Sequence, residues 1–419
     1  MIKIIHTADW HIGQSFFGND RAGEHLHFLQ WLTEQLESME VDVLLISGDV
    51  FDSANPSATS QRMFYHFLRT VTLKCPTLQI VITAGNHDSA ARLEAPLPLL
   101  EGLNIHVVGV IRRIEGEIDY EHLMVNLFNK RGEKEALCMA VPYLRQGDYQ
   151  PVMTDGNLYS EGVAGLYATL YNKIGEKKRP MQAIVAMGHL QATGSEIASI
   201  DHSERTIIGG LECVSPAAFA EGITYTALGH IHKAQRVSHR ENIRYAGSPL
   251  SMSFAEKNYH HGVEMVTIAD GHLVNIEKLD YVPLVSLLSI PATAAEPEEV
   301  LRQLEKLPEL SLEEKAQMIA PYLEVKVLFT EPEPGFSHQV MEIIKNKQVR
   351  LARIIPTYRK VDGEVADEIT AEGLQSMNPL QIVNIAFRKK YQTEMPEELV
   401  TLFNEVCFEV NQNIEEDRR

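Results

Sequence analysis

Five short apolar runs, each followed at once by acidic, amide or imidazole side chains, constrain this chain more than any other feature. The runs lie at Ile2–His6, Val43–Ser47, Gln79–Thr83, Ala183–Met187 and Tyr225–Leu228. Short, nearly continuous runs rich in β-branched residues are typical of strands that are covered on both faces. Between the early runs, apolar residues recur at helical spacing, at Leu26, Leu29, Leu32 and Leu36 and again at Phe64, Phe67, Leu68 and Val71. Strands that alternate with helices predict a layered α/β core.

The polar residues that follow these runs form five motifs. They are Asp9-Trp10-His11, Gly48-Asp49 with Asp52, Gly85-Asn86-His87-Asp88, Gly188-His189 and Gly229-His230-Ile231-His232. Sites in such folds form outside the carboxyl ends of the strands, so we expect the motifs to converge. Seven of the residues offer carboxylate, imidazole or amide ligand atoms: Asp9, His11, Asp49, Asn86, His189, His230 and His232. This donor set, which lacks thiolates, suits first-row divalent cations.

If Asp49 bridges two ions, the seven residues supply two sites of four ligands each. A pair of divalent cations can generate hydroxide from water, clamp a phosphate group and neutralise its charge, so the pattern indicates a two-metal phosphoesterase. His87 follows a ligand-type residue and is expected to stay outside the coordination sphere, where it can assist the leaving group. Asp52 and Asp88 are candidates for orienting ligand or catalytic imidazoles through hydrogen bonds.

Taken singly, each motif has an ordinary structural explanation. Asp49 alone is compatible with a turn or a helix N-cap, and His230-Ile231-His232 alone with a surface turn. It is the joint occurrence of five motifs, all at strand ends, that favours a metal site. The other histidines, including His25, His27 and the pair His260-His261, are interpreted as surface or packing residues.

Length and composition set wider bounds. A chain of 419 residues with 44% apolar and 23% charged residues is expected to form two or three globular domains. We find neither a signal-peptide pattern at Met1–His6 nor an apolar run near the ~20 residues needed to cross a bilayer. The four cysteines are far apart and form no CxxC pair. We therefore expect a cytoplasmic protein with no membrane partner.

The net charge of −19 at first argues against a nucleic-acid partner, because phosphate binding usually leaves a basic footprint. Two bound divalent cations, however, would reverse the local field at the site. The acidity is also uneven, since residues 394–419 contain eight acidic side chains and two arginines. Global charge therefore does not decide the partner. No P-loop pattern is present, so any ATP hydrolysis must come from another chain.

A change of pattern after Tyr281-Val282-Pro283 indicates a second domain. The order predicted there is strand, helix, strand, helix, strand, at Leu284–Ile290, Pro297–Leu307, Tyr322–Phe329, Phe336–Lys345 and Val349–Tyr358. A polar linker and two amphipathic helices follow, the first starting at Asn378-Pro379 and the second near Pro396. Helices of this kind need a docking surface. The predicted domains are 1–280, a βαβαβ cap at 281–362 and a helical segment at 372–412.

The five motifs, with Gly247-Ser248-Pro249-Leu250-Ser251-Met252-Ser253-Phe254 after the last, resemble the calcineurin-like binuclear metallophosphoesterases. Within that superfamily the chain resembles the SbcD family, the nuclease subunits of bacterial SbcC–SbcD complexes. Phosphatases of the superfamily carry Arg and Glu where this chain has Ser53 and Asp88, which favours the nuclease branch. The resemblance implies a layered α/β metallophosphoesterase β-sandwich flanked by helices, with a small α+β cap domain and C-terminal helices.

The resemblance also implies the roles of the site residues. Asp9, His11, Asp49 and His232 would hold one ion, and Asp49, Asn86, His189 and His230 the other. Manganese is the implied metal, and His87 the catalytic histidine, supported by Asp88. The implied activity is that of a DNA nuclease, a double-strand 3′–5′ exonuclease and single-strand or hairpin endonuclease, in DNA end processing, replication and recombination.

The implied partners are DNA, an SbcC-type coiled-coil ATPase that binds the C-terminal helices, and a second copy of the chain. The homodimer would form through helices near residues 57–73 and 90–101, and the cap would help to position DNA. Two alternatives stay open. One is a nucleotide or small-molecule phosphodiesterase that uses the same ions, and the other is an adaptor in which the phosphoesterase core is only a scaffold.

Overall fold

The computed structural model describes residues 1–153, 157–196, 213–311, 319–330 and 333–359, together with scattered residues between 380 and 403. The chain divides into two units, Met1–Tyr358 and Arg359–Arg419. Apart from those scattered residues, the predicted linker and the two C-terminal helices lie outside the described part of the chain. No helix in the described ranges combines the length and the apolar character needed to cross a membrane.

The first of two large sheets has six strands in the order β18-β17-β1-β4-β5-β6. Its strands are β1 (Ile2–Thr7), β4 (Val43–Ser47), β5 (Gln79–Thr83), β6 (Ile105–Val108), β17 (Gly262–Ala269) and β18 (His272–Asp280). The strands β1, β4, β5 and β6 are parallel, whereas β17 and β18 are antiparallel to their neighbours. Three predicted strands, β1, β4 and β5, are therefore confirmed as adjacent parallel strands.

The second sheet also has six strands, in the order β15-β16-β14-β11-β10-β9. Its strands are β9 (Met124–Phe128), β10 (Lys134–Ala140), β11 (Ala183–His189), β14 (Tyr225–Gly229), β15 (Gln235–Val237) and β16 (Arg240–Tyr245). The inner strands β10, β11, β14 and β16 are parallel. The predicted strands at β11 and β14 are confirmed. In each large sheet the parallel strands end at a common edge, and the motifs follow those ends.

The alternation of side chains along β4 explains why two sheets pack together. Val43 and Leu45 belong to one buried apolar cluster, which also contains residues of the second sheet. Leu44 and Ile46 face the other way, into a cluster under the helices α1 (Ala22–Ser38) and α2 (Ala58–Lys74). A strand with apolar side chains on both faces can only be satisfied by two covering layers. The core is thus a layered sandwich of sheets between helices.

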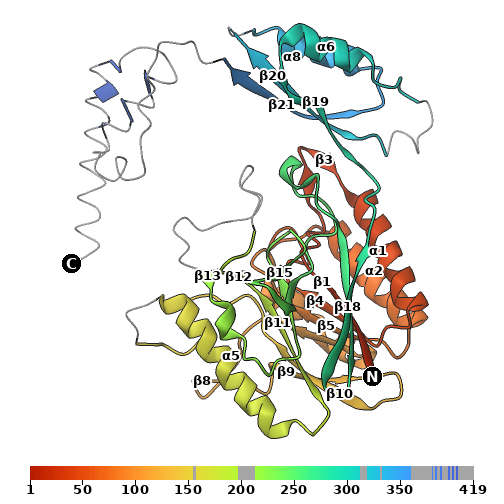
Figure 1. Ribbon diagram of the computed structural model, residues 1–419, viewed down its shortest axis with the longest axis vertical. Helices are drawn as coiled ribbons and strands as arrows, with labels where there is room; N and C mark the ends of the chain where they lie inside the picture. Colours follow the sequence, from red (N-terminus) through yellow and green to blue (C-terminus); the bar gives the residue numbers. More distant parts are fainter. Residues whose placement is uncertain are drawn as a thin grey trace. The chain divides into compact units, whose positions relative to one another are not determined.

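Helices cover the outer faces of the sandwich. Figure 1 shows α1 and α2 on one side of the sheets and α5 (Leu158–Lys177) on the other. The helix predicted from the leucine repeat is confirmed, but Leu26 is 52% exposed and Phe28 is buried in its place. The remaining short elements are β2 (Ser15–Phe16), β3 (Asn19–Asp20), α3 (Ala90–Glu94), α4 (Leu97–Leu100), η1 (Glu101–Leu103), β7 (Arg113–Ile114), β8 (Glu117–Ile118), β12 (Gln191–Ala192), β13 (Cys213–Val214), η2 (Pro216–Ala218) and η3 (Phe254–Glu256).

The predicted βαβαβ order after residue 281 is confirmed in the described residues. The elements are β19 (Leu287–Ala295), α6 (Pro297–Glu305), β20 (Tyr322–Phe329), α8 (Phe336–Ile344) and β21 (Arg350–Tyr358). The three strands form a parallel sheet in the order β19-β20-β21. An apolar cluster that includes Val300, Leu323 and Val340 lies between this sheet and its helices. Tyr322 of β20 donates a hydrogen bond to the buried Glu24 of α1 at 2.9 Å.

Candidate metal centre

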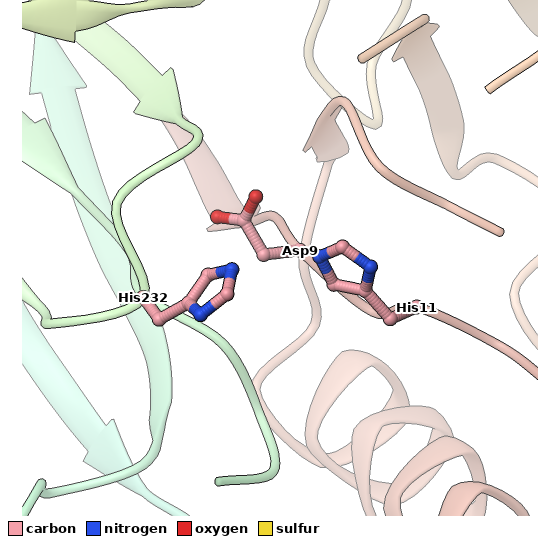
Figure 2. Close-up of side chains that lie close together, drawn as sticks. All are labelled: Asp9, His11 and His232. Carbon is pink, nitrogen blue, oxygen red and sulfur yellow. The ribbon is translucent and has the colours of Figure 1, made fainter. Parts of the chain in front are cut away.

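The five motifs converge as their positions at strand ends predicted. Three of their side chains, from Asp9, His11 and His232, are buried and place their ligand atoms within 4.8 Å of one another. Figure 2 shows these three side chains facing one another, with His232 on a segment far from Asp9 and His11 in the sequence. Trp10 holds the first motif in place, because its buried ring packs edge-on against aromatic residues of α1 and α2. The sandwich thus brings residues 9 and 232 to one point.

A second group shares Asp9 and adds Asp49 and His189. The carboxylate of Asp49 lies 3.2 Å from Nε2 of His189 and 3.6 Å from Nε2 of His11, so it stands between the two groups. This is the location expected of a carboxylate that bridges two ions. Asp9 is also close to both groups, since its carboxylate lies 4.0 Å from Nδ1 of His189.

Asn86 completes the second group. Its Oδ1 lies 3.0 Å from Nε2 of His189 and 3.1 Å from Nδ1 of His230. Nδ1 of His189 lies 2.9 Å from the carbonyl oxygen of Ser47 and donates a hydrogen bond to it. Because a carbonyl can only accept, this bond places the proton of the neutral ring on Nδ1 and leaves the lone pair of Nε2 toward Asn86 and Asp49. All seven ligand-type residues therefore lie within one cluster.

The backbone of the motif loops is unusual. Asp9, His11, Asp49 and His230 have positive φ angles, of 55°, 47°, 50° and 98°. Residues other than glycine rarely adopt this conformation, and where they do the strain often accompanies function. Hydrogen bonds between the first two loops hold it, from the Asp9 amide to the carbonyl of Gly48 and from the His11 amide to the carbonyl of Asp49.

Two glycines allow the loops to approach so closely. A Cβ on Gly48, which has φ +85°, would lie 2.2 Å from Nδ1 of His189. A Cβ on Gly85 would lie 2.1 Å from Oδ1 of Asp49 and 2.3 Å from the Asp49 amide nitrogen. Neither position has room for a side chain. The glycines that precede ligand-type residues in the motifs are therefore required by packing.

The residues present fit divalent cations. Asp9 and Asp49 are buried, and among the described residues neither carboxylate pairs with a lysine or arginine. Nε2 of His11 is also buried and makes no hydrogen bond within the described ranges. Buried charges are normally paired or coordinate metals. Two such carboxylates beside several imidazoles with available lone pairs form a donor set that a pair of cations would satisfy.

The pKa values reflect this crowding. Burial raises the pKa of Asp9, against the opposing effect of His189. Burial also acts to raise the pKa of Asp49, but the neighbouring imidazoles of His189 and His11 outweigh it and hold that pKa well below its usual range. For His189, burial acts to lower the pKa, but the charge of Asp49 overcomes it and raises the pKa to about 9 while no cation is bound, so a bound ion would replace the Nε2 proton that faces Asp49. Burial and the nearby His189 lower the pKa of His230 to about 3, so His230 is neutral and keeps a lone pair.

His87 lies at the rim of this cluster and is half-buried. Its amide donates to Oδ1 of Asp49 at 2.8 Å, and its Nδ1 donates to the carbonyl oxygen of Asp52 at 2.9 Å. Its ring meets that of His11 edge-on. The side chain of Asp52 in turn lies 3.3 Å from Nδ1 of His11. Asp52 is thus placed to orient both His87, through its backbone, and His11, through its carboxylate.

The contacts of Asp88 differ from those expected of a residue that supports His87. The buried carboxylate accepts hydrogen bonds from the backbone amides of Val50, Phe51 and Gly85, at 3.1, 2.9 and 2.9 Å. Burial and the charge of Asp49 raise its pKa to about 6, against these amides. Asp88 therefore connects the second and third motif loops by binding their backbone amides, and these three hydrogen bonds do not involve the side chain of His87.

Sequence reasoning missed one buried carboxylate at this centre. Oε1 of Glu256, in η3, lies 3.0 Å from Nδ1 of His232. Glu256 belongs to no short motif and follows His232 by 24 residues. The only sequence signal nearby is the Gly247–Phe254 stretch that contributed to the resemblance and ends two residues before Glu256.

This fold, with carboxylate, imidazole and amide side chains gathered at its strand ends, defines a metallophosphoesterase. The comparison with known families agrees: residues 2–234 match the calcineurin-like phosphoesterase family. Residues 283–391 match a second family, described as the type 5 capsule protein repressor C-terminal domain. The molecule is thus a phosphoester-hydrolysing enzyme of the calcineurin-like class that binds divalent metal ions.

Curated relatives narrow this class. The SbcD subunit of the nuclease SbcCD from Rhodobacter capsulatus is 34% identical over 85% of this chain and 87% of its own length. The proteins of the same name from Escherichia coli K12 and Bacillus subtilis 168 are 32% and 29% identical, over 69% and 64% of this chain and 70% and 67% of their own lengths. The chain belongs to the SbcD family of calcineurin-like phosphoesterases.

Proposed function

We propose that this chain is a two-metal DNA nuclease that works with an SbcC-type ATPase. The observation that carries the proposal is the convergence of five motifs on a cluster that contains two buried carboxylates without lysine or arginine partners among the described residues. The relatives, which are named as components of the nuclease SbcCD, support DNA as the substrate and a second protein as the partner. The specific activities are duplex 3′–5′ exonuclease and single-strand or hairpin endonuclease.

In this proposal, Asp9, His11, Asp49 and His232 hold one ion, and Asp49, Asn86, His189 and His230 hold the other. Manganese is the proposed metal. When bound, the ions would supply an activated water and neutralise charge on the phosphate. The chain itself contributes rigid donors: the positive-φ loops and the hydrogen bond from Nδ1 of His189 to the Ser47 carbonyl fix the ligand atoms before any ion binds.

His87 is the proposed group that handles the proton of the leaving oxygen. Because its Nδ1 donates to the carbonyl of Asp52, its Nε2 is the atom available to a substrate. A ring protonated at Nε2 donates that proton to the departing oxygen. Asp88 acts indirectly, by holding the loop that carries His87 through backbone hydrogen bonds.

The wider assembly is also part of the proposal. We assign 1–280 to the nuclease domain, 281–362 to a cap that positions DNA and 372–412 to the segment that binds the ATPase. A homodimer would form through α2 and through α3 and α4, which correspond to the predicted helices near 57–73 and 90–101. A cytoplasmic location follows from DNA as the substrate.

The test uses the purified chain with Mn²⁺ and linear duplex DNA. The protein should hydrolyse DNA, and Asp49→Asn should reduce the rate to that of the metal-free protein. His87→Gln should lower the rate by roughly 10²–10⁴-fold while leaving Mn²⁺ binding intact, because the proposal places this ring outside the ligand set. His272→Gln, at an exposed position at the start of β18, is the matched control. Full activity in His87→Gln would contradict the assigned role.

The alternative, a small-molecule phosphodiesterase, shares the ions but not the substrate. The ratio of kcat/KM for duplex DNA to that for bis-p-nitrophenyl phosphate or cyclic nucleotides separates the two. Turnover of the small esters with indifference to DNA would favour the alternative. Recovery of a long coiled-coil ATPase with the chain from native cells would support the nuclease.

A further inference from the structure

Glu256 is a buried carboxylate in direct contact with a ligand-type histidine, and it lies outside the five motifs. Its side chain is 0% exposed. Oε1 lies 3.0 Å from Nδ1 of His232, and Oε2 accepts the backbone N–H of Met252 at 2.7 Å. Both oxygens are therefore engaged, one by the imidazole and one by the loop that precedes η3.

This contact decides which nitrogen of His232 carries the proton. A carboxylate can only accept, so Nδ1 donates to Glu256 and the lone pair of the neutral ring is on Nε2. The ligand atom that His232 contributes lies within 4.8 Å of those of Asp9 and His11. Because Nδ1 donates to Glu256, Nε2 is the ring nitrogen that would bind an ion held by this cluster.

We propose that Glu256 is the positioning residue of the metal centre: it fixes the tautomer and orientation of His232 and makes Nε2 a stronger ligand for one of the two ions. The proposal rests on the two-metal site of the preceding section. Carboxylates behind metal-binding histidines act in this way in general, by raising the basicity of the ligand nitrogen.

The loop that carries Glu256 is itself held in place. Ser251 Oγ lies 2.9 Å from Nε2 of His261, whose Nδ1 donates to the carbonyl of Ser248 at 2.8 Å. The guanidinium of Arg21, from the segment before α1, donates to the carbonyl of Ser251 at 2.7 Å. Anchoring from two directions keeps the carboxylate at a fixed point behind His232. A positioning role requires this rigidity.

The two ions should differ in their dependence on Glu256, because the two ligand histidines His189 and His232 donate their Nδ1 protons to different acceptors. His189 donates its Nδ1 proton to a neutral carbonyl, that of Ser47, whereas His232 donates to a carboxylate. A hydrogen bond to an ionised acceptor is the stronger of the two. Loss of the Glu256 charge should therefore lower the affinity for the ion held by His232 and leave the affinity for the ion held by His189 nearly unchanged.

Glu256→Gln is a sharp test because an amide cannot satisfy both neighbours. Its single oxygen can accept from the Met252 amide or from Nδ1 of His232, but not from both in the present geometry. With the oxygen on Met252, the amide NH₂ faces Nδ1 and drives the ring proton to Nε2, the nitrogen that the ion needs. The variant should thus favour the wrong tautomer.

The experiment titrates the metal-free full-length chain with Mn²⁺ by calorimetry and by electron paramagnetic resonance. In Glu256→Gln, the ion held by His232 should bind about 10–100-fold more weakly than in wild type. The affinity for the ion held by His189 should stay within about threefold of the wild-type value. The resonance signal of a coupled pair should give way to that of a single ion at intermediate Mn²⁺. Excess Mn²⁺ should restore the pair, and Glu256→Asp, which keeps the charge, should lie between the two.

The matched control is Glu264→Gln. Glu264 is also buried, lies in β17 and makes no hydrogen bond or ion pair with the seven ligand-type residues in the described ranges. The Glu264→Gln variant should bind both Mn²⁺ ions with wild-type affinity. Equal affinities in Glu256→Gln and wild type would overturn the proposal, as would equal weakening of both ions. If wild type binds two ions but cleaves no DNA, the proposed function fails while this inference stands.

A measurement on wild type keeps the proposal testable if Glu256→Gln does not fold. Nitrogen chemical shifts of histidine-labelled, metal-free protein report which ring nitrogen of His232 carries the proton, and His232→Gln assigns the signal. The proposal requires the proton on Nδ1. A neutral ring protonated at Nε2 would overturn it.

Discussion

Buried acidic side chains have different partners in the motif loops and in the βαβαβ segment Leu287–Tyr358, the proposed cap. In the cap, Glu324 is buried but has a cationic partner, Arg353, at 2.6 Å. In the motif loops, Asp9 and Asp49 are buried beside each other, and in the described residues their ion-pair contacts are to imidazoles. The charge of Glu324 is thus balanced within the chain, whereas Asp9 and Asp49 form an arrangement of negative charge that external cations would balance.

The motif loops and the cap also differ in their backbone φ angles. Three of the ligand-type residues in the first two loops have positive φ, whereas no non-glycine residue in the described part of the cap does. The described residues of the cap form a parallel sheet with a register irregularity in each strand pairing, and its apolar side chains pack against α6 and α8. Loops in which several ligand-type residues share a rare backbone conformation are candidates for function.

The largest effect should come from a methyl group added to a motif loop. Gly85→Ala places a Cβ 2.1 Å from Oδ1 of Asp49, so the proposed bridging carboxylate or the loop must move by about 1 Å. We expect metal-dependent hydrolysis of bis-p-nitrophenyl phosphate to fall about 100-fold, which corresponds to ~2.7 kcal/mol.

The matched control is Gly335→Ala in the cap, because a Cβ at that position meets no atom of the described residues within 4 Å. Its activity should equal that of wild type, and its free energy of unfolding should stay within about 0.5 kcal/mol. Equal activities in the two alanine variants would remove the contrast between the regions.

A smaller effect is expected from a cavity in the cap. Val340 in α8 is fully buried, and Val340→Ala removes two methyl groups from the cluster under β20. Urea denaturation should show a loss of about 2 kcal/mol in the stability of the cap. Hydrolysis of the small ester should change less than twofold.

Met341→Ala, at the next and exposed position of the same helix, should cost less than about 0.5 kcal/mol. A large drop in small-ester turnover for Val340→Ala, alongside its loss of stability, would contradict the prediction. It would show that the metal centre depends on the packing of the cap.

The smallest effect concerns pH. Burial of His6 in β1 lowers its pKa to about 3, against a hydrogen bond with the Leu228 backbone that acts to raise it. The folded state therefore takes up this proton only near pH 3, whereas the unfolded chain takes it up near pH 6.5. The stability contributed by a neutral His6 is fully present above pH 6.5 and is lost as the pH falls toward 3.

Between pH 7.5 and 5.5, His6 alone should account for a loss of about 1 kcal/mol in the free energy of unfolding. His6→Gln should remove this part of the slope in urea titrations at the two pH values. His338→Gln, at an exposed position in the cap, should leave the slope unchanged. An unchanged slope in His6→Gln would contradict the assignment.

Most of the inner strands could be predicted from the sequence, because strands that are covered on both faces form continuous apolar runs. The bounds of β4, β5 and β20 agree with those predicted. Edge strands were harder to predict: β9 alternates buried and exposed residues, β18 has Leu279 as its one buried residue, and their mixed composition gave no clear apolar run. The helical phase of α1 was also ambiguous, since Leu26 fits the same spacing as the buried leucines.

For the site, spacing within a motif was informative and contacts between distant segments were not. The seven ligand-type residues were found because each follows a strand. The backbone contacts of Asp88 depend on two loops that meet only in three dimensions. Glu256 depends on the path of the chain after β16, which no local pattern encodes.

The hydrogen bonds between the first two motif loops bear on selectivity for the ion. The amides of Asp9, His11 and Ile12 each donate to a carbonyl of the facing loop, so the donor atoms are held apart at set positions by the chain itself. A cation that enters such a rigid cage gains little from chain adjustment. Ionic radius and preferred coordination geometry should then decide which metals are accepted, and exchange of one ion for another should proceed without refolding.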